Sequence, residues 1–158
     1  MARWEDVEAS EPEFAARARG FFEAGKHKTL ATLRADGSPR ISGSEADFVL
    51  GDLWFGGMWE SRKALDLRRD PRFALHSPSV DPPAWPGDAK VAGRVEEIED
   101  PEAKQRLLDA QGNGPHEGPF HLFRADVEEV VVVRLGEPAD HLLIELWRPG
   151  RELVRMKR

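Results

Sequence analysis

The chain has 158 residues, of which 40% are hydrophobic and 33% are charged, a balance that fits one globular domain over residues 1–158. Its formal net charge of −6 argues against a nucleic-acid binder, and the absence of cysteine excludes disulfides, thiolate nucleophiles and iron–sulfur clusters. No stretch of about 20 apolar residues could cross a membrane, and the charged first residues do not form a signal peptide, so we expect a cytoplasmic protein.

The N-terminal part of the sequence predicts one helix followed by three antiparallel strands. Ser10 and Glu13 have the spacing of a capping box, and Gly25 ends the helix that they open. Two hairpin turns follow, Asp36-Gly37 and Gly51-Asp52, each flanked by β-forming residues. The expected strands cover residues 28–34, 39–46 and 53–55.

The segment after Gly56-Gly57 predicts a helix with an unusual first turn. Ser61 is a good N-cap residue, and Pro71 cannot continue the helix. The first turn of a helix carries partial positive charge and prefers acidic residues, yet this one holds Arg62 and Lys63. Exposed backbone N–H groups, a hydroxyl and two cations suit a bound phosphate, and two preceding glycines allow a ligand to approach closely. The simplest alternative is a solvated surface helix.

Side chains near this helix start extend the hypothesis of a ligand site. Arg40 follows the first hairpin turn and could reach a phosphate, or could remain an exposed arginine at a sheet edge. The small residues Ser42-Gly43-Ser44 leave room for a planar ligand, or else mark a β-bulge. Met58 and Trp59 could cover a flat ring, although hydrophobic packing explains them equally simply.

The remaining sequence predicts further strands around one more helix. The helix begins at Asp100-Pro101 and ends near Gln111. Hairpins link most of the strands, so the sheet is antiparallel and closes into a barrel. We therefore expect a mainly β (α+β) fold, an antiparallel barrel with a few peripheral helices. These later strands are expected at residues 72–77, 89–98, 120–124, 127–135 and 141–147.

The sequence lacks motifs that would let side chains or a metal ion catalyse a reaction without an organic cofactor. The five histidines show no metal-binding spacing, so no metal site is predicted. Gly43-Ser44-Glu45 does not complete the Gly-x-Ser-x-Gly elbow of a serine hydrolase. A barrel with a cationic helix start, a glycine gap and nearby aromatics, but no nucleophile, fits a cofactor that brings its own chemistry.

Two runs of sequence resemble those of the pyridoxamine 5′-phosphate oxidase-like split-barrel flavoproteins. Residues 29–39, TLATLRADGSP, look like the first hairpin of that family. Residues 61–75, SRKALDLRRDPRFAL, look like its phosphate-binding helix and the following strand. The spacing between the two runs also fits, and the resemblance covers about residues 25–98.

The resemblance implies a six-stranded split β-barrel that forms a homodimer, with two cofactors at the subunit interface. It implies that Ser61, Arg62 and Lys63 hold the phosphate of flavin mononucleotide (FMN). Arg40 would assist them from the neighbouring strand. The implied activity is a flavin-dependent oxidoreductase, in which hydride moves between FMN and an unidentified small organic substrate.

Further residues are assigned to the cofactor's ring by the same resemblance. Ser42, Ser44 and Met58 would lie along the ring system, and Trp147 would close the site from the partner subunit. Residues 146–152 do not match the substrate-binding end of true pyridoxamine-phosphate oxidases, so that particular reaction is not expected. A deazaflavin-dependent reductase using the 8-hydroxy-5-deazaflavin coenzyme, and a non-catalytic cofactor-binding protein, are the alternatives.

Overall fold

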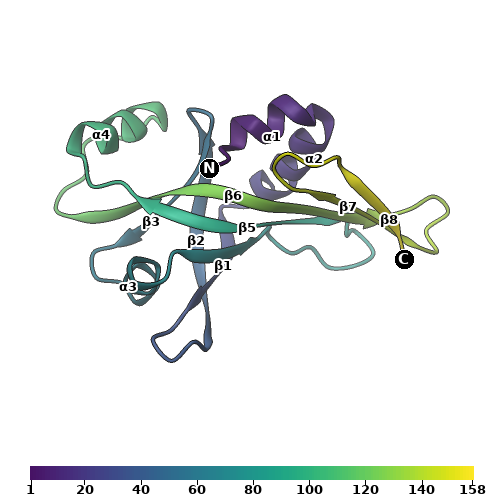
Figure 1. The fold of residues 1–158 in the computed structure, drawn as a ribbon, viewed down its shortest axis with the longest axis horizontal. Coiled ribbons are helices and arrows are strands. Elements are labelled where there is room, and N and C mark those ends of the chain that lie inside the picture. Colours follow the sequence, from purple (N-terminus) through teal and green to yellow (C-terminus); the bar gives the residue numbers. More distant parts are fainter.

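The computed structural model describes all 158 residues, which form eight strands and four helices (Figure 1). The strands are β1 (His27–Leu33), β2 (Pro39–Val49), β3 (Asp52–Met58), β4 (Arg72–His76), β5 (Asp88–Glu97), β6 (Phe120–Leu135), β7 (Leu142–Trp147) and β8 (Val154–Lys157). The helices are α1 (Trp4–Ser10), α2 (Pro12–Glu23), α3 (Arg62–Arg69) and α4 (Pro101–Ala110).

The first six strands close into an antiparallel barrel. Their order is β3-β2-β1-β4-β5-β6, and a further pairing of β3 with β6 closes the ring. Strands β7 and β8 continue the sheet beyond β6 as an extension. Figure 1 shows this extension at one end of the molecule, with α3 and α4 toward the other. The predicted mainly β fold, a six-stranded barrel with a few peripheral helices, is confirmed.

The two hairpins predicted in the N-terminal part are present. Gly37 adopts φ +84° in the β1–β2 turn, a conformation that favours glycine. In the β2–β3 turn both Leu50 and Gly51 have positive φ, 56° and 77°, as a tight hairpin turn requires. Because this turn takes only two residues, β2 runs on to Val49 instead of ending at Ala46.

Strand β6 is one strand of 16 residues, so the prediction of two separate strands at residues 120–124 and 127–135 was wrong. It pairs in succession with β3, β5 and β7, and these partners keep it extended through its middle. The irregularity lies in its register with β5, where Gly93 pairs with Val127. A Cβ on Gly93 would meet the Asp126 carbonyl oxygen at 2.0 Å, so this crossing requires glycine.

The N-terminus contains two helices where the sequence predicted one. Helix α1 ends at Ser10 and α2 begins at Pro12, with Glu11 at the N-cap and no side-chain cap. The predicted capping box at Ser10 is therefore wrong. The Ser10 hydroxyl instead donates to the Asp6 carbonyl and accepts from the Trp147 indole N–H at 2.9 Å. Strand β8 was also not predicted.

Helix α3 is anchored to the barrel by its inner face. Ala64 and Leu67 belong to the main hydrophobic core, and buried Asp66 accepts a hydrogen bond from Thr32 of β1 at 2.8 Å. This anchoring fixes where the N-terminus of α3 points. None of the four helices has the length and apolar character needed to span a membrane.

Candidate functional site

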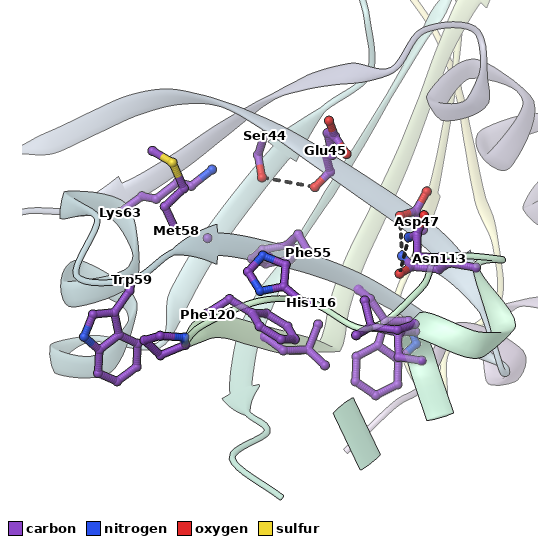
Figure 2. Close-up of a pocket in the computed structure, with 18 of the residues that line it drawn as sticks. Ser44, Glu45, Asp47, Phe55, Met58, Trp59, Lys63, Asn113, His116 and Phe120 are labelled. Carbon is purple, nitrogen blue, oxygen red and sulfur yellow. Dashed lines mark hydrogen bonds between the residues drawn. The ribbon is translucent and has the colours of Figure 1, made fainter. Parts of the chain in front are cut away.

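The larger of two cavities beside α3 has a volume of about 650 Å³, a usual size for a small-molecule site. Strands β2 and β3 form one wall, Lys63 of α3 closes one end, and α4 with the loop after it forms the opposite wall (Figure 2). Its apolar lining comes from Trp54, Phe55, Met58, Trp59, Leu107, Leu108, Pro119, Phe120 and Leu122.

The two ends of this larger cavity differ in charge. Figure 2 shows Lys63 and Met58 at one end and Asp47 with Asn113 at the other, while His116 lies between them. Asp47 is tied to α4 through a hydrogen bond from Gln111 at 2.6 Å. No group of three or more histidine, aspartate or glutamate side chains is placed to hold a metal ion. The cavity therefore suits an elongated organic ligand whose anionic end faces Lys63.

Ser61 has the backbone conformation of an N-cap but does not cap its helix. Its φ and ψ are −59° and 148°, and its side chain makes no hydrogen bond to the first turn of α3. The Oγ atom is buried and has no partner. A Cβ built on Gly57 would lie 3.1 Å from this oxygen, so the missing side chain leaves a small notch beside it. An unpartnered hydroxyl and free backbone N–H groups at a helix start fit a phosphate group.

Lys63 brings the positive charge at this end of the larger cavity. Its ammonium group donates to the Gly43 carbonyl oxygen on β2 at 3.1 Å. Burial lowers the pKa of Lys63, and the nearby Glu45 carboxylate opposes that shift only in part. An anionic ligand would stabilise the charged form of Lys63, so the residues at this end fit the phosphate of a flavin-type cofactor.

A second cavity of about 340 Å³ lies on the other side of α3 and is lined by four arginines. Successive helix residues point about 100° apart, so Arg62 faces this second cavity while Lys63 faces the larger one. Arg40 lines it from β2 and donates to Asp66 at 2.7 Å. The four arginines are Arg34, Arg40, Arg62 and Arg69.

The structure brings only part of the predicted set together. Ser44 and Met58 line the larger cavity with Lys63, although Met58 is 81% exposed. Ser42 is half-buried on β2 opposite Leu30 and lines neither cavity. Ser61 also lines neither cavity, and its Oγ lies behind Gly57, which lines the larger one.

Trp147 lies apart from the other predicted residues. It is 3% exposed, packs in the main core and donates to Ser10. Its indole is therefore unavailable to a partner subunit.

Two parts of the site escaped the sequence reasoning. Asp66 gathers Thr32, Arg40 and Arg69 around one buried carboxylate, and it is the only acidic residue in a helix rich in arginine. A single aspartate among arginines indicates a buried ion pair, so the sequence did contain a signal for this cluster. The wall formed by α4 carries no local signal, because only the packing of distant elements places it over β3.

The fold and the site together define a small split-barrel protein with a cavity suited to a phosphorylated cofactor. The family model described as pyridoxamine 5′-phosphate oxidase matches residues 14–134. The chain therefore belongs to the pyridoxamine 5′-phosphate oxidase family, and the resemblance found in the sequence is confirmed. No curated protein sequence gives a significant match to the chain.

Solved structures share this architecture. Protein Rv2991 from Mycobacterium tuberculosis has 24% identity and a TM-score of 0.61, covering 73% of this chain and 81% of its own. A protein named F420 reductase has 21% identity and a TM-score of 0.54, covering 71% and 94%. A member of the pyridoxinephosphate oxidase family from Clostridium acetobutylicum has 15% identity and a TM-score of 0.60, covering 93% and 96%. At these identities the likeness establishes the fold.

Proposed function

We propose that this protein is a flavin-dependent oxidoreductase of the pyridoxamine-phosphate-oxidase-like split-barrel type. It binds FMN with the phosphate at the start of α3 and the ring in the larger cavity. There, hydride is exchanged with a small organic substrate that is still unidentified. The observation that carries the proposal is the buried, unpartnered Ser61 hydroxyl, which faces the notch at Gly57 beside Lys63.

The proposal gives a physical role to several residues of the site. The Ser61 hydroxyl and the first N–H groups of α3 donate hydrogen bonds to the phosphate oxygens, and Lys63 neutralises the phosphate charge. Trp59 and Phe120 supply flat apolar walls that orient a ring and exclude water. A bound flavin supplies the hydride chemistry itself, so the chain needs no nucleophile of its own.

We further propose that two copies of the chain associate around the cofactors. Large exposed apolar side chains lie on three elements of this region: Met58 on β3 and Leu65 on α3 line the cavities, and Ile41 on β2 follows Arg40 of the second cavity. Exposure of such side chains is common at interfaces between subunits. Analytical ultracentrifugation of the wild type should therefore show a dimer, and Ile41→Asp should shift it toward monomer. A monomeric wild type at about 100 µM would contradict this part of the proposal.

The direct test is a fluorescence titration of the purified protein with FMN. We expect binding below about 100 µM, a free energy of more than about 5 kcal/mol. Arg62→Ala combined with Lys63→Ala should weaken it by about 1.5–3 kcal/mol, the contribution of one charge-assisted hydrogen bond, because Lys63 faces the larger cavity and Arg62 faces the second one. Lys157→Ala with Arg158→Ala removes the same charge at the far end of the chain and should leave the affinity unchanged. Absence of binding by the wild type would refute the FMN proposal.

A deazaflavin is the second candidate cofactor, favoured by the four arginines of the second cavity. Two aspartates, Asp36 and Asp66, line the same cavity, so its lining keeps a net charge of +2, which suits a longer anionic tail. A structural neighbour is also named F420 reductase, after the 8-hydroxy-5-deazaflavin coenzyme. Parallel titrations decide between the two, since Arg34→Ala should weaken deazaflavin binding by several-fold and leave FMN binding unchanged.

A cofactor-binding protein without catalysis would give the same titrations. Stopped-flow reduction of the bound cofactor separates the two functions. An oxidoreductase allows reduction by a chemical donor such as a reduced nicotinamide, whereas a storage protein retains an oxidised cofactor throughout.

A further inference from the structure

His121 is a fully buried histidine beside the proposed site. It lies on β6 with 0% of its surface exposed. Its ring stacks on Trp59 with a centroid distance of 4.6 Å and an interplanar angle of 8°. Phe123 lies on a nearly parallel plane, with its centroid 6.1 Å from that of His121. A polar ring at this depth requires hydrogen-bond partners on both nitrogens.

Both ring nitrogens of His121 have partners, and these partners determine which nitrogen carries the proton. The Glu60 backbone N–H lies 3.1 Å from Nε2, and a backbone N–H can only donate. Nε2 is therefore the acceptor. The proton must then be on Nδ1, which donates to the Glu97 carboxylate at 2.6 Å.

Glu97 is held in turn by α3. Arg68 donates to both of its carboxylate oxygens, at 2.6 and 3.1 Å. Burial raises the pKa of Glu97, but the hydrogen bonds from Arg68 and His121 outweigh burial and lower the pKa overall. The carboxylate is therefore charged at neutral pH, and it connects β5, β6 and α3 through one chain of hydrogen bonds.

The segment held by this chain of hydrogen bonds lies between β3 and α3. Glu60 has φ +57°, a left-handed conformation that residues other than glycine adopt only when their surroundings impose it. Trp59 forms part of the cavity wall, and Ser61 directly follows Glu60. The hydrogen bond to His121 Nε2 and the stack on its ring are contacts that impose this conformation.

We infer that His121 is a positioning residue for the proposed cofactor site. By accepting the Glu60 N–H and stacking on Trp59, it holds the Trp59–Ser61 segment so that the start of α3 and the tryptophan wall face the ligand. Glu97 and Arg68 keep the histidine in the required tautomer. This inference rests on the proposed function for its effect on affinity, but the positioning itself is measurable without any cofactor.

Two substitutions of His121 separate its two hydrogen bonds. The amide oxygen of His121→Gln reaches the place of Nε2 and can still accept from Glu60. The shorter His121→Asn can replace the Nδ1 donor to Glu97 but does not reach Glu60. Phe123→Leu is the control, because it disturbs the same stack and removes no hydrogen bond.

The first readout is hydrogen exchange at the amides of residues 60–63 in the protein without cofactor. We expect exchange in His121→Asn at least tenfold faster than in His121→Gln, with Phe123→Leu unchanged in this segment after correction for global stability. The imidazole ¹⁵N spectrum of the wild type should show a proton on Nδ1. Equal exchange in the Asn and Gln variants, or a proton on Nε2, would overturn the inference.

The second readout is the cofactor titration. His121→Asn should weaken binding about tenfold more than His121→Gln. If the wild type binds neither FMN nor a deazaflavin, the proposed function fails, and the exchange measurement still decides whether His121 positions the segment. If the wild type binds and the two variants bind equally, the positioning inference fails while the proposed function stands.

Discussion

Buried polar groups are fully hydrogen-bonded on the inner face of α3 but lack a partner at the start of the same helix. On the inner face, buried Asp66 accepts from Thr32, Arg40 and Arg69 at 2.7–3.0 Å. At the helix start, the buried Ser61 Oγ has no partner at all. The two sites are only five residues apart in the sequence, yet one is complete within the protein and the other is incomplete.

This difference separates structure from function within one helix. A buried polar cluster in which every group is paired stabilises the fold and leaves nothing for a ligand. A buried hydroxyl without a partner costs free energy unless something else supplies the hydrogen bond. Arg40, which the sequence assigned to the cofactor phosphate, already has a carboxylate partner, so any contact with phosphate comes in addition to that pair.

The largest expected effect is on the free energy of unfolding and comes from the hydrogen-bonded cluster around Asp66. Asp66→Ala removes the shared carboxylate and leaves two arginines and a threonine without their partner. Arg40 and Arg69 remain partly exposed to water, so we expect the loss typical of hydrogen bonds to a charged group, about 1.5–3 kcal/mol. Urea unfolding should show a loss of that size in the free energy of unfolding. A loss below about 1 kcal/mol would mean that the cluster contributes little to the fold.

The loss of folding stability at low pH should depend on the same Asp66 carboxylate. Burial opposes its ionisation, but hydrogen bonds from Arg40, Thr32 and Arg69 together hold the pKa below the ordinary value of 3.8. A lowered folded pKa means that the stabilisation is complete above about pH 5 and is lost as the pH falls through the folded value. The stability difference between wild type and Asp66→Asn should be constant from about pH 5 to 7 and shrink below about pH 4. A constant difference down to pH 2 would contradict the assignment.

A smaller effect, on cofactor affinity, is expected from filling the notch beside the unpartnered Ser61 hydroxyl. In Gly57→Ala the new Cβ lies 3.1 Å from Ser61 Oγ, close enough to occupy the notch but not to force a large movement. We expect cofactor affinity to fall about tenfold, or ~1.4 kcal/mol, with the melting temperature nearly unchanged. Gly20→Ala on α2 lies outside both cavities, meets no atom within 4 Å and serves as the control. Unchanged affinity in Gly57→Ala would show that the notch is not part of the site.

The smallest effects are expected from Ser61→Ala, and they should have opposite signs for the free energy of unfolding and for cofactor affinity. Ser61→Ala removes a buried oxygen that has no partner, so the protein without cofactor should keep its stability or gain up to about 1 kcal/mol. Cofactor binding should weaken by about 1 kcal/mol, because the hydroxyl no longer donates to the phosphate. If urea unfolding instead shows a loss above 1 kcal/mol, the hydroxyl caps α3 in solution.

Local chemistry in the chain was sufficient for the fold class and for several element boundaries, and it marked the candidate site. Asp36-Gly37 marked the first hairpin, because glycine reaches positive φ without steric cost. Asp100 marked the start of α4, and its side chain accepts from Ala103 N–H as an N-cap does. Residues 61–63 marked the end of the larger cavity where Lys63 lies and where we propose that the phosphate binds, because basic residues at a helix start conflict with its dipole.

Long-range packing decided what those local patterns could not. Strand β6 is continuous because three different strands pair along it, and Trp147 is buried because Ser10, 137 residues away, accepts its N–H. Arg62 and Lys63 are adjacent in the sequence yet face different cavities, since the anchoring of Ala64 and Leu67 sets the rotation of α3. Turn and cap preferences act within a few residues and can be read along the chain, whereas burial and partnership depend on contacts between distant segments, which exist only once the barrel has closed.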